Sequence, residues 1–338
     1  EWSELPDPEP RADEVVVAVR ACALNHLDLW VRNGIDGVRY PLPLVPGSEI
    51  AGEVLEIGAA VEGWHPGNPV LVAPGLSCGV CERCLAGEDP LCRHYGILGE
   101  SRDGGYAERV AVPARNLVPV PRGLSYAEAA ALPLVFLTAW HMLQRAALRA
   151  DEDVLVHAAG SGVSSAAIQI ARLLGARRIF ATAGDDSKLE RARALGATHT
   201  IAYRDRDFVR AVKEATAGRG VDVVVDHVGG EVFERSLKAL AWGGRIVLCG
   251  ATAGAEATIN LRVVFFKSLS ILGSTMGSLG EFKRLLHFVE SGQLSAVLDR
   301  TYPLREAPAA QAALAAREQF GKIVLLVGED AVPTPPSS

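Results

Sequence analysis

The sequence predicts an α/β protein with a β-rich first part and a second part built on a doubly wound parallel sheet. Up to about residue 118, short β-branched segments alternate with Gly and Pro, which is typical of antiparallel strands and turns. From about residue 125, helices of ten or more residues alternate with short apolar runs, as in a parallel sheet buried on both faces. A chain of 338 residues is also long enough for about two domains.

The expected elements follow this division. The first part carries strands at 14–19, 50–58, 68–73 and 107–112. The second part carries strands at 153–157, 178–182, 221–226, 244–249 and 269–273, then an amphipathic helix at 281–291. Strands at 298–304 and 322–327 return to the first domain. We therefore expect one domain from 1–119 and 294–330 with a lobe at 75–95, a second from 120–293, and a disordered tail at 331–338.

The charge and hydropathy of the sequence limit the classes of partner that we expect the protein to bind. The formal net charge is -6, and Lys and Arg are scattered, so no basic stripe is present to gather phosphate backbones. No apolar run approaches the roughly 18 residues of a membrane span, and the first residues lack the pattern of a signal peptide. We expect a cytoplasmic protein that acts on a small-molecule substrate, with neither nucleic acid nor a membrane as partner.

Four cysteines predict a metal site. Cys78, Cys81, Cys84 and Cys92 have the spacing C-x2-C-x2-C-x7-C in a Gly-containing loop. Four thiolates close a tetrahedral shell around one zinc ion and leave no open position for a substrate, so this zinc is structural. The alternative is an incidental disulfide pair, which a reduced compartment disfavours.

A small-residue turn at 158–164 predicts a dinucleotide site. It joins an apolar strand to a helix, so backbone N–H groups and the helix dipole face a pyrophosphate. Ala159, Ser161 and Ser164 stand where the fingerprint has glycine, and the motif alone is a weak signal. Its place within a strand–turn–helix–strand unit strengthens the prediction. The expected contacts are Gly160, Ser161, Gly162 and Val163.

The end of the next strand bears on the choice of coenzyme. Ala183 stands where a carboxylate would hold the ribose 2′-hydroxyl, and Gly184 follows it. The missing acid favours NADP(H), with Lys188 as a ligand of the 2′-phosphate. Asp185 and Asp186 leave NAD(H) open, and Lys188 as a solvated residue at a helix start is the alternative.

The landmarks, taken in order, resemble the medium-chain dehydrogenase/reductase superfamily, the zinc-type alcohol dehydrogenases and their quinone-oxidoreductase relatives. They are 25–28 (Asn-His-Leu-Asp), 46–52 (Pro-Gly-Ser-Glu-Ile-Ala-Gly), the cysteine lobe, 104–108, 132–139, the turn at 158–164 and 195–197. The resemblance covers nearly the whole chain. It implies a GroES-like catalytic domain, a Rossmann domain and an NAD(P)-dependent oxidoreductase.

The departures from that family concern its catalytic zinc. Asn25 and Ser48 stand where zinc alcohol dehydrogenases have Cys and His, and no cysteine lies near 134–136. Glu49 alone cannot hold the metal, and Leu27 replaces the Thr that relays the alcohol proton. Hydride transfer to a quinone or activated alkene spreads the developing charge, so hydrogen-bond donors can replace the metal.

The resemblance also implies roles for single residues. Asn25 would orient a substrate carbonyl or the nicotinamide, unless it only caps a turn, and Trp30 would form an aromatic wall where metal-free relatives have Tyr. The remaining expected coenzyme contacts are His26 at the pyrophosphate, Thr138 near the nicotinamide ribose, Tyr203 near the adenosine phosphate, and Gly250. Each of these also has an ordinary structural reading.

Three functions remain distinct at this point. The first is an NAD(P)H-dependent reductase of quinones or activated alkenes and carbonyls, with a structural zinc only. The second is an alcohol or aldehyde dehydrogenase, and the third is a nucleotide-binding protein without turnover, similar to crystallin relatives of quinone reductases. The apolar edge strand at 269–273 predicts a homodimer or homotetramer, because an unpaired edge invites association.

Overall fold

The computed structural model describes residues 2–35 and 37–328, and the chain divides into two compact units. Unit 1 comprises Glu1–Leu137 and Gly277–Ser338, and unit 2 comprises Thr138–Met276. The sequence placed these boundaries at 119/120 and 293/294. The helix α3 (Tyr126–Ala130) belongs to unit 1 because it packs against the sheet of that unit. The predicted disordered tail at 331–338 lies outside the described residues.

Unit 1 is built on a seven-stranded sheet. Its strands are β1 (Glu14–Ala23), β2 (Glu49–Ile57), β3 (Pro69–Val72), β6 (Arg109–Pro113), β7 (Leu117–Pro119), β14 (Leu298–Pro303) and β15 (Lys322–Leu326). The order is β14-β15-β1-β2-β3-β7, with β6 also paired to β1. All these pairs are antiparallel except β14 with β15. The two C-terminal strands therefore complete a sheet begun by the N-terminal ones, as the sequence predicted.

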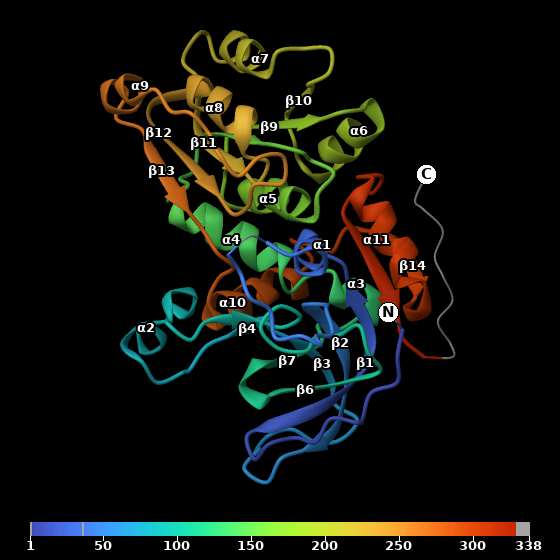
Figure 1. Ribbon diagram of the computed structural model, residues 1–338. Helices are drawn as coiled ribbons and strands as arrows, with labels where there is room; N and C mark the ends of the chain where they lie inside the picture. Colours follow the sequence, from blue (N-terminus) through green and yellow to red (C-terminus); the bar gives the residue numbers. More distant parts are fainter. Residues whose placement is uncertain (1, 36, 329–338) are drawn as a thin grey trace. The chain divides into compact units, whose positions relative to one another are not determined.

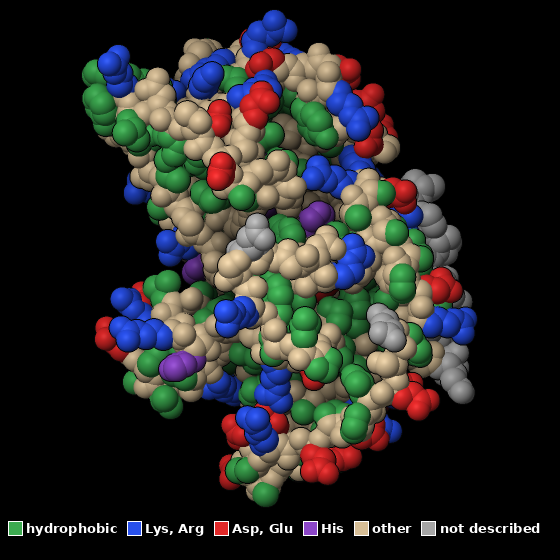
Figure 2. Space-filling view, viewed as in Figure 1, with side chains coloured by type: hydrophobic (Ala, Val, Ile, Leu, Met, Phe, Trp, Pro, Cys, Tyr) green, Lys and Arg blue, Asp and Glu red, His purple; other side chains and the backbone are tan. Residues whose placement is uncertain are grey.

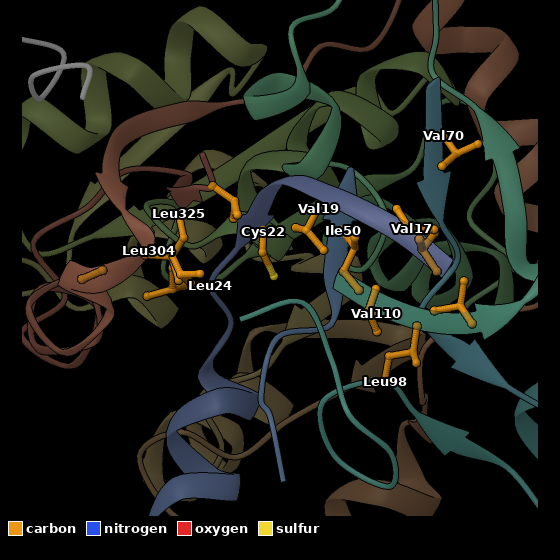
Figure 3. Close-up of a cluster of buried hydrophobic side chains, with 14 of the residues drawn as sticks. Val17, Val19, Cys22, Leu24, Ile50, Val70, Leu98, Val110, Leu304 and Leu325 are labelled. Carbon is orange, nitrogen blue, oxygen red and sulfur yellow. The ribbon is translucent and has the colours of Figure 1, made fainter. Parts of the chain in front are cut away.

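A small second sheet and five helices complete unit 1. The short pair β4 (Gly75–Leu76) and β5 (Gly96–Ile97) encloses the cysteine lobe. The other helices are α1 (His26–Asn33), α2 (Glu82–Leu85), α10 (Leu279–Glu290) and α11 (Ala307–Ala315). Branched side chains of β1, β2, β3 and β15 form the core, and Figure 3 shows Val17, Val19, Cys22, Ile50 and Leu325 within this apolar cluster. Burial of this apolar surface is the main stabilising contribution to the sheet.

Unit 2 is a doubly wound parallel sheet with the strand order β10-β9-β8-β11-β12-β13 (Figure 1). These strands are β8 (Asp153–Val156), β9 (Arg178–Ala183), β10 (His199–Ala202), β11 (Val221–Asp226), β12 (Leu240–Leu248) and β13 (Ser270–Gly273). The helices are α5 (Gly162–Leu173), α6 (Asp186–Leu195), α7 (Phe208–Ala215), α8 (Gly230–Ala239) and α9 (Leu261–Phe266), and α4 (Val135–Arg145) crosses the boundary between the units. Every residue of β8 and β11 is buried, as expected for strands covered on both faces, and valine and leucine dominate their sequences although Asp153, Asp222 and Asp226 also occur in them. The chain order reverses between β8 and β11, where such sheets bind ligands.

One helical stretch corrects an expectation from the sequence. Tyr126–Arg145, which comprises α3, α4 and the turn between them, is long and apolar enough to cross a membrane by length and composition alone, whereas the sequence was expected to contain no such run. However, 78% of its most apolar window is buried inside the protein, as in an ordinary core helix, so it is weak support for a membrane segment. On the face that Figure 2 shows, Lys and Arg are interspersed with Asp and Glu. The absence of nucleic-acid and membrane partners stays a prediction.

Candidate functional site

Four thiols converge in the lobe between β4 and β5. Cys81 lies at the N-cap of α2 and Cys92 follows a short 3-10 helix, so these turns bring the spaced cysteines together. The four sulfur atoms lie within 4.8 Å of one another, with Cys84 3.8 Å from Cys78 and 3.5 Å from Cys81. Sulfurs bound tetrahedrally at about 2.3 Å from zinc lie about 3.8 Å apart, so the cluster fits one zinc ion. The backbone N–H groups of Val80 and Cys81 lower the pKa of Cys78 to about 6, which favours the thiolate.

Asn25 lies in a second polar cluster, at the start of α1. It occupies the N-cap position and is buried. Its amide nitrogen donates to Oε2 of Glu49 at 3.1 Å, and its amide oxygen accepts a hydrogen bond from Nζ of Lys322 at 2.7 Å. The nitrogen also lies 3.5 Å from the carbonyl oxygen of Ala23. The orientation of the amide is therefore set within the chain, and its predicted contact with substrate stays a prediction.

Glu49 is the centre of this cluster. It begins β2 and is fully buried, and its Oε1 accepts the backbone N–H groups of Leu134 at 2.7 Å and Val135 at 3.1 Å. Its Oε2 lies 2.5 Å from the ammonium of Lys322, the first residue of β15. Lys322 also donates to the carbonyl oxygen of Leu24 at 2.5 Å. Four donors thus surround the carboxylate, and the buried charge is paired, as its burial requires.

The donor atoms of these residues differ from those of a typical catalytic zinc site. Asn25 and Ser48 offer an amide and a hydroxyl in place of the nitrogen and sulfur ligands that zinc prefers. The carboxylate of Glu49 is already bound by backbone amides and by the charge of Lys322. Within residues 2–35 and 37–328, only the four cysteines form a group of three or more potential metal ligands. The hydroxyl of Ser48 is buried and has no hydrogen-bond partner among the described residues.

Asp28 lies beside this cluster and has a raised pKa. Its Oδ2 accepts the backbone N–H of Asn25 at 2.8 Å and the hydroxyl of Tyr106 at 3.0 Å. Burial raises the pKa of Asp28 to about 6, although both hydrogen bonds act in the opposite direction. Gly47 makes this packing possible because it has a φ of 102°, and a Cβ there would overlap Tyr106 and Cys22.

The other predicted residues of α1 are His26 and Trp30. They lie on one helix, are partly buried, and have ring centroids 6.4 Å apart in an edge-to-face arrangement. Burial lowers the pKa of His26, and the charges of Arg317 and Lys322 act in the same direction. Their predicted roles at the pyrophosphate and at the substrate stay predictions.

The predicted coenzyme turn connects β8 with α5 in unit 2. Ser161 is the N-cap of α5, and its hydroxyl oxygen accepts the backbone N–H of Ser164 at 3.0 Å. Gly162 and Val163 begin the helix directly after Ser161, and Gly160 precedes Ser161 in the turn. The arrangement places a helix N-terminus after a buried parallel strand, which is the local geometry that binds a pyrophosphate.

The end of β9 shows a contact that bears on the choice of coenzyme. Ala183 is the last residue of this strand, and its carbonyl oxygen accepts the backbone N–H of Tyr203 at 3.2 Å. Beyond Gly184, Asp185 caps α6 by accepting the backbone N–H of Lys188 at 3.0 Å. The ammonium of Lys188 also lies 4.0 Å from the carboxylate of Asp185. The lysine therefore faces a carboxylate of its own helix start, which competes with a 2′-phosphate for its charge.

The last two predicted contacts are both in unit 2. Thr138 is buried in α4, and its hydroxyl lies 3.9 Å from the sulfur of Met276. Gly250 follows the carboxyl end of β12 at the edge of the sheet where β8 also ends. Sequence reasoning missed two residues that the fold brings to these sites, Lys322 and His227. The only available signals were a lysine opening an apolar strand and a histidine directly after one.

Comparisons with known proteins agree with this architecture. Residues 11–122 match the alcohol dehydrogenase GroES-like domain, and residues 162–291 match the zinc-binding dehydrogenase domain. The acryloyl-coenzyme A reductase of Metallosphaera sedula is 32% identical over 96% of each chain. An NAD-dependent alcohol dehydrogenase of Sulfolobus acidocaldarius is 33% identical over 95% of this chain and 94% of its own. A crystal structure of an NAD-dependent alcohol dehydrogenase is 52% identical, with a TM-score of 0.93 over 96% of this chain and 95% of its own.

The chain belongs to the medium-chain dehydrogenase/reductase superfamily. This confirms the predicted family and its combination of a GroES-like domain with a Rossmann domain. The protein is an NAD(P)-dependent oxidoreductase of the zinc-type alcohol dehydrogenase group, and its four-cysteine cluster and NAD-dependent relatives support zinc and NAD(H). The predicted preference for NADP(H) stays a prediction.

Proposed function

We propose that the protein reduces an activated alkene with a nicotinamide coenzyme and without a metal ion at the acceptor. The supporting observation is the cluster of Asn25, Glu49 and Lys322. In it, the carboxylate of Glu49 is bound by the buried ammonium of Lys322 and by two backbone N–H groups. A ketone or aldehyde concentrates the developing negative charge on one oxygen, where a Lewis-acid metal contributes several kcal/mol. A conjugated acceptor spreads that charge, so this cluster is compatible with its reduction.

The relatives favour an alkene that is conjugated to a carbonyl group. The acryloyl-coenzyme A reductases of Metallosphaera sedula and Sulfurisphaera tokodaii are 32% and 30% identical to this chain over 96% and 95% of it. Their named substrate is an α,β-unsaturated thioester. A nicotinamide coenzyme held at the turn before α5 would supply the hydride for a new C–H bond at the β-carbon, and the alkene π bond would break. The α-carbon then takes a proton from solvent, so the reduction consumes one hydride and one proton.

We propose NAD(H) as the working coenzyme, with NADP(H) as the alternative indicated by Ala183. The contact between Asp185 and Lys188 supports this choice, because it occupies the cation that a 2′-phosphate would need. Replacement of Asp185 by Ser keeps the cap of α6 and releases Lys188. We expect this variant to gain affinity for NADPH relative to NADH. An unchanged NADPH/NADH affinity ratio would count against the proposal.

The experiment for the reaction measures zinc per chain and kcat/KM with NADH for four acceptors: acryloyl-coenzyme A, an enone, a quinone and an aldehyde. We expect one zinc per chain and a kcat/KM for the unsaturated thioester or enone at least about 100-fold above that for the aldehyde. A second zinc with efficient aldehyde or alcohol turnover would support the dehydrogenase alternative. Tight NADH binding without turnover of any acceptor would support the non-catalytic alternative.

We also propose that the protein forms a homodimer through β13. This strand is at one edge of the six-stranded sheet, and Ile271 in it is 38% exposed. Large apolar side chains of α9, Leu261, Phe265 and Phe266, are exposed as well. A second copy that continues the sheet at this edge pairs the free backbone groups of β13 and buries apolar surface.

A further inference from the structure

His227 lies directly after β11 and contacts both serines of the coenzyme turn. Its Nε2 is 2.9 Å from Oγ of Ser161 and 2.9 Å from Oγ of Ser164. β11 and β8 are neighbours at the point where the strand order reverses, so the residues that follow them meet at one edge of the sheet. In the sequence, His227 comes 66 residues after Ser161 and 63 residues after Ser164.

The position of His227 is held by its own loop. The carboxylate of Asp226 accepts the backbone N–H groups of Val228 at 2.7 Å and Gly229 at 3.3 Å, which sets the turn after β11. The carbonyl oxygen of His227 accepts the backbone N–H of Thr252 at 3.1 Å. These bonds restrain the backbone on both sides of the imidazole, so its contact with the serines is a property of the folded sheet edge.

The hydrogen bonds of the two serines determine the proton on Nε2. The hydroxyl of Ser164 donates its only proton to the carbonyl oxygen of His157 at 2.6 Å. Ser164 can therefore only accept from His227, which means that Nε2 carries a proton. The same N–H faces Oγ of Ser161, which already accepts the backbone N–H of Ser164. Because a protonated Nε2 cannot accept a hydrogen bond, the hydroxyl proton of Ser161 remains for another acceptor.

We propose that His227 is a coenzyme-positioning residue that acts through Ser161. Its N–H, together with the backbone N–H of Ser164, occupies the lone pairs of the Ser161 oxygen and directs the remaining proton to a phosphate oxygen of the coenzyme. Donors to the same oxygen also polarise the hydroxyl and strengthen the bond it donates. Ser161 stands where the fingerprint has the glycine that lets the backbone approach the pyrophosphate, so its hydroxyl is close to that group. The proposal concerns coenzyme binding and does not depend on the acceptor.

The test compares the dissociation constants of NADH, ADP and adenosine, from NADH fluorescence and competition, in the zinc-loaded full chain. The variants are His227→Leu, which removes the donor, His227→Gln, which retains an N–H, Ser161→Ala, and the double variant H227L/S161A. His199→Leu is the matched control. His199 is the first residue of β10, so it lies where the strands begin, whereas His227 lies where they end. Thermal unfolding without ligand shows whether each variant is folded.

We expect His227→Leu and Ser161→Ala each to lower the affinity for NADH and for ADP about five- to tenfold. The affinity for adenosine should not change, because adenosine has no phosphate. His227→Gln should recover most of the affinity, and the double variant should bind no more weakly than Ser161→Ala. The proposal would be overturned if His227→Leu bound NADH with wild-type affinity, or if its affinity for adenosine fell by the same factor. It would also be overturned if the affinity of the double variant fell by the product of the two single factors. A loss of the same size in His199→Leu would do so as well.

Discussion

Replacement of Lys322 by Met removes a buried charge while keeping a side chain of similar length. Lys322 is 3% exposed and Glu49 is fully buried, with 2.5 Å between the ammonium and the carboxylate. In the variant, Glu49 keeps its bonds to Leu134, Val135 and Asn25 but has no cation. Loss of one partner from a buried ion pair costs about 3–5 kcal/mol, because the other charge stays buried without compensation. We expect the free energy of unfolding of K322M to fall by about that amount.

The double variant E49Q/K322M separates the ion pair from simple packing effects. It removes both charges, so it should lose less free energy than the sum of E49Q and K322M, with a coupling of at least about 2 kcal/mol. Arg206→Met is the matched control, because Arg206 pairs with Glu214 at the surface and both side chains are about half exposed. That control should change stability by less than about 1 kcal/mol.

Urea denaturation of the zinc-loaded proteins, followed by circular dichroism and tryptophan fluorescence, measures these differences. Agreement between the two signals tests whether one free energy describes the transition. The reasoning is wrong if K322M unfolds within about 1 kcal/mol of the wild type, or if the effects of E49Q and K322M simply add. In either case the 2.5 Å contact would contribute little to the stability of unit 1.

Three further predictions follow from other sites. Cys84→Ser should release the zinc ion and destabilise the lobe between β4 and β5; elemental analysis that still gives one zinc per chain would contradict the four-thiolate site. Burial raises the pKa of Asp28 to about 6, so protonation of Asp28 favours the folded state, and its contribution to stability is lost as the pH rises from about 4 through 6. The stability of Asp28→Asn relative to the wild type should therefore rise by about 2 kcal/mol between pH 4 and pH 8, and a difference that is constant with pH in urea denaturation would refute the raised pKa. Ile271→Lys places a charge on the edge strand β13 and should convert the proposed dimer to a monomer in sedimentation, whereas a wild-type that is already monomeric would remove this proposal.

Several features could be predicted because their signals are local. The largely apolar runs that became β8, β9 and β11 are almost entirely buried, and each is followed by a helix. The four cysteines lie within 15 residues, so short turns are enough to bring their sulfurs together. The domain boundaries were harder to place. Nothing in the composition of 120–137 indicates that α3 packs on the sheet of unit 1 rather than on that of unit 2.

The role of Asn25 illustrates the limit of sequence reasoning. Its amide was predicted to face a substrate or to cap a turn, and the structure shows it at the N-cap and bound to Glu49 and Lys322. Lys322 is 297 residues away in the sequence, and it reaches Asn25 only because β15 pairs with β1. No local pattern records that pairing, since any apolar strand with a lysine at its start has the same appearance.

The sequence by itself predicted most strands of both sheets, the four-cysteine lobe and the turn between β8 and α5, because periodicity, thiol spacing and turn residues act over a few neighbours. Tertiary structure alone decided which charges meet. It placed the ammonium of Lys322 against the carboxylate of Glu49, and the imidazole of His227 against Ser161 and Ser164. Both contacts depend on strand pairing in a sheet, where a shift of register by one residue turns each side chain to the other face. The chemistry of both sites is therefore set by register, and register is fixed only when the sheet is complete.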